Sequence, residues 1–321
     1  MRELTISKND AGQRLDKFLT KALCDIPPAL MYKAIRQKKI KVNRHRAEGK
    51  QILQEGDTLQ LFLAEEFFKE KEDAHKHDLA RITPRICPVY EDENILLLNK
   101  RPGVLVHEDE AGNGDTLITH LQAHLYQKGE YDPAAEQSFA PALCNRIDRN
   151  TGGIVIAAKT AEALRVINEK IRSGGIHKHY LCAVHGIPSP REATLTGYLI
   201  KNSKDNTVRV YDKDPGHGAK DIRTRYRVLA TKGGSALLEI DLLTGRTHQI
   251  RAHMAHIGHP LWGDGKYGVN RDDRARGYKF QALYAYRLGF DRAGDWGALN
   301  GLRGKEFSIP PSEIYFTKEF E

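Results

Sequence analysis

The sequence predicts an α+β fold, in which a small N-terminal domain precedes a large domain built on a mixed, largely antiparallel sheet. Three observations support this prediction. The first 64 residues carry a helix, helix, strand pattern of their own, and a charged stretch follows them. From residue 81, strands and helices are mixed without regular strand–helix alternation. A chain of 321 residues has room for one large domain and a smaller companion.

Residues 1–64 are expected to form the small domain. The segment "AGQRLDKFLTKAL" places Leu and Phe at helical spacing, with Asp10 as a candidate N-cap. "PPALMYKAIRQKKI" starts with prolines suited to a first helical turn and continues as a helix to Ile35. "IKVN" and "DTLQLFL" alternate as short strands, and a turn is expected at 55–57. Residues 65–80 are rich in charge and predict a linker, which leaves 81–321 for the large domain.

A basic stretch of one sign lies in the small domain. Residues 31–50 contain eight Lys and Arg but a single acid, Glu48. An exposed, solvated helix face is one interpretation, but charge of a single sign favours a surface that binds phosphates. The residues expected to make these contacts are Lys33, Arg36, Lys38, Lys39, Lys41 and Arg44.

The large domain shows both strand and helix patterns. "ILLLNKRPGVLVH" (95–107) predicts two short strands broken by Pro102 and Gly103. Residues 114–129 and 160–174 have amphipathic helical spacing, with Asp115 and Thr160 as their expected caps. Further strands are expected at 152–159 and 177–186, a strand pair at 222–231 and 235–245, and a helix at 247–258.

Composition narrows the class of protein. A net charge of +8 and a pI of about 9.1 favour an anionic partner. The four cysteines lie far apart without a CxxC pair, as in a protein with reduced thiols. The first residues lack a secretory signal pattern, and no apolar run approaches the roughly 20 residues of a membrane helix. We therefore expect a cytoplasmic protein without a membrane partner.

Metal and nucleotide cofactors are not expected. His248, His253, His256 and His259 crowd one segment, but no HExxH pattern and no acid accompany them, and arginines flank them. Gly152 and Gly153 precede a strand, whereas a phosphate-binding loop leads into a helix. The glycine-rich turn "GDGKYG" (263–268) also lacks a dinucleotide pattern.

The stretch "CNRIDRNTGG" (144–153) contains the most distinctive acid of the chain. Asp148 stands between Arg146 and Arg149, just before an apolar strand. A structural ion pair in a turn is one interpretation, and a catalytic carboxylate kept ionised by its neighbours is the other. Glycosidases use two carboxylates, and the sequence offers no obvious second acid near Asp148.

Four segments, in order, resemble motifs of the large-subunit class of RNA pseudouridine synthases. They are "VYEDENILLLNKRPGVLVH" (89–107), "NRIDRNTGGIVIAAKT" (145–160), "KHYLCAVHG" (178–186) and "LTGRTHQIRAHMAHIGHPLWGDGKYG" (243–268). The second segment departs from the family pattern at Asn145, where His is usual, and at Gly152, where Ser is usual. The N-terminal "QRLDKFL" and "MYKAIRQKKIKVN" are similar to the S4 RNA-binding domain.

The resemblance implies the pseudouridine synthase fold with an N-terminal S4 domain and the isomerisation of uridine in RNA without a cofactor. Asp148 matches the catalytic acid, which either attacks the sugar or removes a sugar proton. Arg251 matches the arginine that pairs with this acid, and Arg146 one that helps to extrude the target base. Tyr180 matches the tyrosine against the uracil and is a candidate for the C5 proton. Further RNA contacts are expected from Arg149, Lys178, Arg246 and His248.

The expected substrate is 23S ribosomal RNA, because a folded RNA offers phosphates to an S4 domain outside the active site. Transfer RNA is the alternative substrate. A non-catalytic S4 protein that binds the ribosome is the alternative from another class, and in that case Asp148 would be a structural ion pair. We expect the protein to be a monomer.

Overall fold

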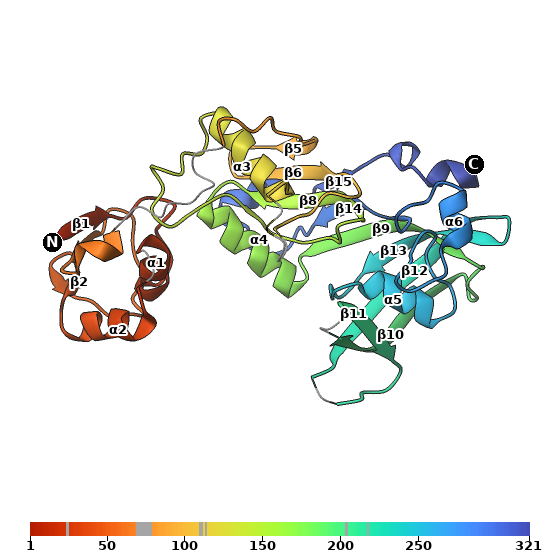
Figure 1. The fold of residues 1–321 in the computed structure, drawn as a ribbon, viewed down its shortest axis with the longest axis horizontal. Helices are drawn as coiled ribbons and strands as arrows, with labels where there is room; N and C mark the ends of the chain where they lie inside the picture. Colours follow the sequence, from red (N-terminus) through yellow and green to blue (C-terminus); the bar gives the residue numbers. More distant parts are fainter. Residues whose placement is uncertain (24–25, 69–78, 109–111, 113, 203–204, 217) are drawn as a thin grey trace. The chain divides into compact units, whose positions relative to one another are not determined.

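The computed structural model describes residues 1–23, 26–68, 79–108, 112, 114–202, 205–216 and 218–321. The chain divides into two compact units (Figure 1). The first comprises Met1–Pro84 together with Thr119–Ala142 and Ala158–Arg165. The second comprises Arg85–Ile118, Leu143–Ala157 and Val166–Glu321.

The N-terminal part of the first unit is a small α/β domain. Its sheet has the order β1-β4-β2-β3, built from β1 (Arg2–Thr5), β4 (Thr58–Leu61), β2 (Ile40–Val42) and β3 (His45–Arg46). Helices α1 (Leu15–Ala22) and α2 (Pro28–Arg36) belong to the same core, in which Phe18, Leu19 and Leu59 are fully buried. The helix predicted from the two prolines is therefore confirmed, with Pro28 in its first turn.

The predicted cap of the first helix is wrong. Helix α1 begins at Leu15 after Arg14, so Asp10 lies too early to cap it. Asp10 is instead buried, and it accepts hydrogen bonds from the hydroxyls of Ser7 and Ser138. The partner Ser138 is 128 residues away, which local spacing does not reveal. In the predicted linker, Glu65–Phe68 form a short 3-10 helix (η1), and 69–78 lie outside the described residues.

The second unit is built on an 11-stranded sheet with the order β11-β10-β12-β13-β9-β14-β8-β6-β5. β15 (Glu306–Ser308) pairs with β14, and β7 (Ala142–Leu143) pairs with β8. Strands β9 to β13 run antiparallel to their neighbours, whereas β8 and β14 are parallel, which confirms the mixed, largely antiparallel sheet. The other strands are β5 (Pro88–Glu91), β6 (Ile95–Lys100), β8 (Gly152–Ala158), β9 (Ile176–His185), β10 (Glu192–Asn202), β11 (Thr207–Tyr211), β12 (Lys220–Lys232), β13 (Ser235–Leu242) and β14 (Leu283–Phe290).

The remaining helices are α3 (Leu117–Gln127), α4 (Ala161–Ser173), α5 (Gln249–His256) and α6 (Arg271–Ala275). Most of α3 and the start of α4 belong to the first unit, and α5 and α6 belong to the second. Short 3-10 helices lie at Gly297–Leu302 (η2), Pro311–Glu313 (η3) and Thr317–Phe320 (η4). The predicted cap of α4 is confirmed, because the Thr160 hydroxyl accepts from the Ala163 amide at 3.2 Å and Gly174 takes φ +82° beyond its end. Helix α5 contacts β11 and β12.

Two predictions for the segment before α3 fail. Residues 95–107 contain one strand, β6, and not two, because after Pro102 only Leu105 makes a bridge, to Thr116. Helix α3 begins at Leu117, so Asp115 is not its cap, and its carboxylate pairs with Arg85.

Gly152 and Gly153 permit the close approach of β8 to β14. A Cβ at Gly153 would lie 2.2 Å from the Ala285 carbonyl oxygen, and the backbone there has φ +115°. A Cβ at Gly152 would lie 2.3 Å from Cε2 of Tyr284. The glycine pair is therefore a packing requirement, and it fixes where the chain that carries Asp148 enters the sheet.

The composition led to expectations about membrane helices and about cysteines, and both can be compared with the described residues. No helix there is long and apolar enough to span a membrane. Cys87 and Cys182 are free thiols, and Cys24 lies outside the described residues.

Candidate active site

Asp148 lies in a pocket of about 960 Å³ in the second unit. Four segments form most of its wall: 105–108, 143–151, the start of β9, and 245–251. All eight large-domain residues predicted as catalytic or RNA-binding line this pocket, although they come from distant parts of the sequence: Arg146, Asp148, Arg149, Lys178, Tyr180, Arg246, His248 and Arg251.

The loop that carries Asp148 is held at both ends. The Cys144 amide donates to the Ile156 carbonyl, and the Asn145 side-chain oxygen accepts from the Ile156 amide at 2.8 Å. At the other end, the Thr151 amide donates to the Asp148 carbonyl at 3.0 Å. Asn145, at the position where the family resemblance expects His, thus anchors the loop to the second half of β8.

The carboxylate of Asp148 faces a guanidinium that two acids share. Arg251, on α5, donates from Nη1 to Oδ2 of Asp148 at 2.8 Å. Its Nε and Nη2 donate to the two carboxylate oxygens of Asp264 at 2.7 and 2.8 Å. Burial opposes the charge of Arg251, but the ion pairs with Asp264 and Asp148 more than offset it and raise the pKa of Arg251. The guanidinium is therefore permanently charged and held in one orientation.

Tyr180 lies on β9 and lines the same pocket. The side chain is buried, and this burial raises the pKa of Tyr180 well above its ordinary value. The negative charge of Asp148 raises this pKa further. The phenol therefore keeps its proton at neutral pH, so the pocket presents a neutral ring and a hydroxyl.

His248 sits between Asp148 and an aromatic partner. Its Nε2 is 3.8 Å from Oδ2 of Asp148, and its Nδ1 lies 2.8 Å from the Tyr267 hydroxyl. Burial lowers the pKa of His248, with the nearby Asp148 opposing, so the ring is neutral at physiological pH. Its backbone has φ 52°, a left-handed conformation unusual for a residue other than glycine, at the start of α5.

Cations dominate the remaining lining. The described lining residues contain seven Lys and Arg against two carboxylates, Asp148 and Glu108. Arg146 is exposed and makes no hydrogen bond or ion pair with a described residue. Burial lowers the pKa of Lys178, which has no acidic partner among the described residues. A pocket with this charge attracts a polyanion.

Sequence reasoning missed five residues of the site. Lys266 and His107 line the pocket, and Asp264, Tyr267 and Lys100 support it from behind. Lys266, Asp264 and Tyr267 belong to "GDGKYG", a turn that the sequence reasoning tested only for a dinucleotide pattern, which it lacks. Lys100 is fully buried, and its Nζ donates to the carbonyls of Val104 and Arg149 at 2.9 and 2.8 Å.

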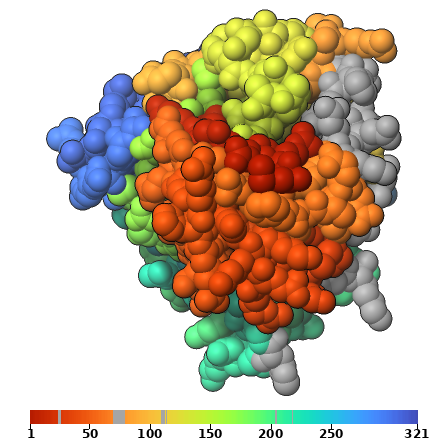
Figure 2. Space-filling view, turned by 90° about the vertical axis from the view of Figure 1, so that its left-hand side faces the viewer, coloured from red at the N-terminus to blue at the C-terminus, as the bar shows by residue number. Residues whose placement is uncertain are grey.

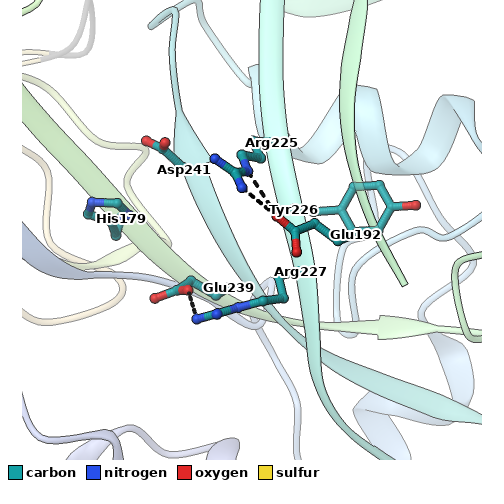
Figure 3. Close-up of a pocket in the computed structure, with 7 residues that line it drawn as sticks. All are labelled: His179, Glu192, Arg225, Tyr226, Arg227, Glu239 and Asp241. Carbon is teal, nitrogen blue, oxygen red and sulfur yellow. Dashed lines mark hydrogen bonds and ion pairs between the residues drawn. The ribbon is translucent and has the colours of Figure 1, made fainter. Parts of the chain in front are cut away.

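Figure 3 shows a second pocket, of about 180 Å³. His179, which lines it, is adjacent to Tyr180 on β9, and adjacent strand residues point to opposite faces. Its arginines are already paired, Arg225 with Glu192 and Arg227 with Glu239 (Figure 3). Both arginines thus have an acidic partner, and none of the predicted catalytic residues lines this pocket.

The histidine segment does not form a metal-binding group. His253 bonds the Thr224 hydroxyl at 3.0 Å, His256 bonds Asp212 at 2.8 Å, and His259 bonds the His185 carbonyl at 3.0 Å. Within the described parts of the chain, no three His, Cys, Asp or Glu side chains come together as metal ligands would.

The N-terminal basic stretch lies on the surface of the small domain, whose residues face the viewer in red and orange in Figure 2. Of the six predicted phosphate-binding residues, five are exposed and Lys41 is half-buried, with its ammonium 5.6 Å from the centre of the Phe62 ring. Phe62 itself is 42% exposed, an aromatic surface that the charge pattern did not identify. A lysine over an exposed ring, with five exposed cations in the same stretch, suits a nucleic-acid backbone and its bases.

The chain belongs to the RNA pseudouridylate synthase family, whose sequence model matches residues 94–256. A model of the S4 domain matches residues 13–59. The chain is thus an RNA pseudouridine synthase, an isomerase with an N-terminal S4 domain, as the resemblance implied.

Two proteins similar to this chain are described as "Ribosomal large subunit pseudouridine synthase C". The protein from Vibrio cholerae is 32% identical over 272 residues, 84% of this chain and 81% of its own. The one from Salmonella typhi is 32% identical over 301 residues, 91% of this chain and 89% of its own. The structure of human RNA pseudouridylate synthase domain containing 1 matches the fold with a TM-score of 0.55 at 21% identity, over 71% of this chain and 84% of its own.

Proposed function

We propose that the protein isomerises uridines of large-subunit (23S) ribosomal RNA, with Asp148 as the reacting carboxylate. The observation that carries the assignment of Asp148 is its place in a cation-lined pocket, where Arg251 holds it at 2.8 Å. The substrate assignment rests on the relatives described as ribosomal large subunit enzymes.

The reaction breaks the bond from N1 of uracil to C1′ of the ribose and forms a bond from C5 to C1′. Asp148 either bonds to C1′ while the uracil turns and leaves when C5 bonds to C1′, or removes a sugar proton and returns it once the new bond has formed. A hydrogen leaves C5 and a proton ends on N1, so atoms and electrons balance without an oxidant or a metal. Arg251 keeps Asp148 aimed at the sugar, because its Nη1 donates to Oδ2 of Asp148 from a fixed guanidinium.

Tyr180 supplies the surface against which the uracil lies. Because its phenol is protonated, it accepts the C5 proton only if it gives up its own proton in the same step. Arg146, exposed and without a described partner, fills the position that the extruded base leaves in the RNA. Arg149, Lys178 and Arg246 hold backbone phosphates at the rim, and His248 contacts the RNA beside Asp148.

The domains divide this work in the proposal. Residues 1–64 bind ribosomal RNA away from the reacting uridine, 65–80 link the domains, and 81–321 form the catalytic domain. The enzyme is proposed to act as a cytoplasmic monomer.

The test is release of tritium from RNA labelled at C5 of uridine. Wild-type protein is expected to release tritium from large-subunit ribosomal RNA, and the variant Asp148→Asn is not, while its affinity for RNA stays within about threefold. Asp212→Asn, which changes an exposed acid paired with His256 outside the pocket, is the matched control and keeps full activity. Turnover by Asp148→Asn would show that Asp148 is not the reacting carboxylate. Faster turnover of transfer RNA than of ribosomal RNA would show that the substrate assignment is wrong.

A further inference from the structure

We infer that Asp264 is a positioning residue for the reaction, which it serves by fixing the guanidinium of Arg251 against Asp148. This inference rests on the role proposed above for Asp148. Asp264 lies beyond the residues that the family model matches and does not line the pocket. Its side chain is fully buried and cannot contact the substrate, so it affects the reaction through its ion pair with Arg251.

The contacts of Arg251 divide its nitrogens between the two acids. Asp264 takes Nε and Nη2 in a two-point fork at 2.7 and 2.8 Å, which leaves Nη1 for Asp148. A fork of two parallel hydrogen bonds fixes the plane of a guanidinium, whereas a single bond leaves it free to turn. The plane is therefore set from behind by Asp264, and Asp148 receives one N–H in a fixed direction.

Asp264 is itself held in place. Its Oδ1 accepts the backbone amides of Lys266 at 3.0 Å and Tyr267 at 3.3 Å, which tightens the turn "GDGKYG". The ring of Tyr267 lies 5.2 Å from the guanidinium carbon of Arg251, and its hydroxyl accepts from the Val208 amide at 2.9 Å. The turn thus presents a carboxylate and an aromatic ring to the same arginine, both anchored to the backbone.

The charges explain why the support must be an acid. When Asp148 bonds to the sugar or takes a proton, it loses the negative charge that attracts Arg251. A guanidinium with no other partner would then be a buried, uncompensated cation and would move toward another acceptor. Asp264 keeps its charge throughout, because Arg251 holds the pKa of Asp264 below its ordinary value against the effect of burial. Arg251 is therefore already in place when Asp148 becomes ionised again.

The experiment compares Asp264→Asn with Asp273→Asn in the full-length enzyme, using steady-state release of tritium over a range of RNA concentrations. Asp273 is a second buried acid that holds the same turn, by accepting from the Gly263 amide at 2.8 Å, but it bonds His185 and not Arg251. Both variants are expected to unfold at lower urea concentration. Only Asp264→Asn is expected to lower kcat, by roughly 100-fold, with KM and RNA affinity within about threefold. Equal losses of kcat in the two variants would mean that Asp264 serves only to fold the turn, and would overturn the inference.

A double substitution tests whether Asp264 acts through Arg251. In an Arg251→Gln background, adding Asp264→Asn is expected to change kcat by less than about twofold, because the group it positions is already absent. Independent, multiplying losses would overturn the inference. Should Asp264→Asn fail to fold, Asp264→Glu keeps the charge but displaces the fork, and it is expected to lose kcat with KM retained; wild-type kcat in that variant would overturn the inference.

The outcomes separate this inference from the proposed function. If Asp148→Asn is inactive while Asp264→Asn behaves like Asp273→Asn, only the positioning role falls. If Asp148→Asn turns over normally, the proposed mechanism falls and the positioning role falls with it.

Discussion

At the scale of single residues, Tyr180 combines two properties that substitution can separate. Its ring provides a flat surface to the pocket, and its buried hydroxyl stays protonated because burial raises its pKa. We predict that Tyr180→Phe keeps RNA affinity and loses rate by roughly 100-fold, as expected when a proton-transfer group is removed. Tyr180→Ala also loses the ring, worth about 1–3 kcal/mol of base contact, so it binds RNA more weakly. Single-turnover rates and RNA dissociation constants measure the two effects.

The same comparison identifies a purely structural tyrosine. If Tyr180→Phe keeps the wild-type rate and Tyr180→Ala only lowers the free energy of unfolding, the residue belongs to the core and not to the mechanism. A urea titration of each variant supplies that free energy, so a loss of folded protein is not mistaken for a loss of chemistry.

Lys100 is a second residue whose role depends on burial. Its ammonium joins the carbonyls of Arg101, Val104 and Arg149, and the last of these follows Asp148 directly. Burial lowers the pKa of Lys100 to about 7, and the charge of Asp148 opposes this shift. Between pH 7 and the ordinary lysine pKa of 10.5, Lys100 therefore binds a proton in the unfolded chain but not in the folded chain. This residue consequently makes the protein more stable as the pH rises through that window.

We predict that this pH dependence disappears in Lys100→Met. Between pH 7 and pH 9 the wild type should gain up to about 2.7 kcal/mol of unfolding free energy relative to the variant, the effect of two pH units on one proton. At every pH the variant is also less stable, because the carbonyls that Lys100 bonds lose their donor. Urea titrations at both pH values measure the difference, and Lys213→Met, an exposed lysine, is the control. Parallel pH profiles for wild type and Lys100→Met would show that Lys100 stays charged in the folded protein.

At the scale of the secondary-structure elements, β8 illustrates why this chain departs from its family at Gly152. A Cβ there would lie 2.3 and 2.7 Å from two carbons of the Tyr284 ring, whose hydroxyl donates to Asn99 at 2.7 Å. We predict that Gly152→Ser, which restores the family residue, lowers the unfolding free energy by about 1–3 kcal/mol through overpacking. Gly152→Ser combined with Tyr284→Leu should recover part of that loss, because the smaller side chain leaves room for the hydroxymethyl group.

The measurement is a double-substitution cycle of unfolding free energies. A recovery in the double variant relative to the sum of the single variants indicates that the two positions share one volume. Additive losses would mean that the glycine is required by the backbone of β8 and not by Tyr284.

The elements also show what the sequence could and could not predict. Helix α2, strand β8 and the β12–β13 hairpin follow from local periodicity and turn residues, and the structure confirms them. Asp10 and Asp115 have the residue type of helix caps, but partners elsewhere in the chain engage them. For these two residues, long-range contacts outweigh local preference.

The candidate site divides in the same way. Asp148, Tyr180 and Arg251 were recognisable because each stands inside a motif. Asp264 and Tyr267 stand in a motif too, but their task is to hold Arg251, and only the folded chain shows which arginine they meet. Spacing along a chain contains no information about such a contact unless both residues share one element.

At the scale of the whole molecule, each unit has a surface rich in positive charge: the pocket around Asp148 in the second unit and the basic stretch of the small domain in the first. Residues 1–13 also bond other parts of the first unit, since Asn9 donates to Glu136 and Gln13 to Ser138, both at 2.7 Å. Charge substitutions in the full-length chain are therefore a cleaner test of the small domain than its deletion.

We predict that the triple variant Lys33→Gln, Lys39→Gln, Lys41→Gln binds long ribosomal RNA more weakly and with a smaller salt dependence. Removing one lysine–phosphate ion pair should reduce the magnitude of the slope of log K against log salt by roughly 0.7–0.9, so removing three should reduce it by about 2. The single-turnover rate at saturating RNA should stay near wild type, because the predicted catalytic residues lie in the second unit. A control variant, Lys213→Gln, Lys279→Gln, Lys318→Gln, makes the same change in net charge at exposed positions of the second unit outside the pocket. If the slope falls equally in both variants, the effect comes from net charge alone, and the basic stretch of the small domain is a solvated face without a role in binding.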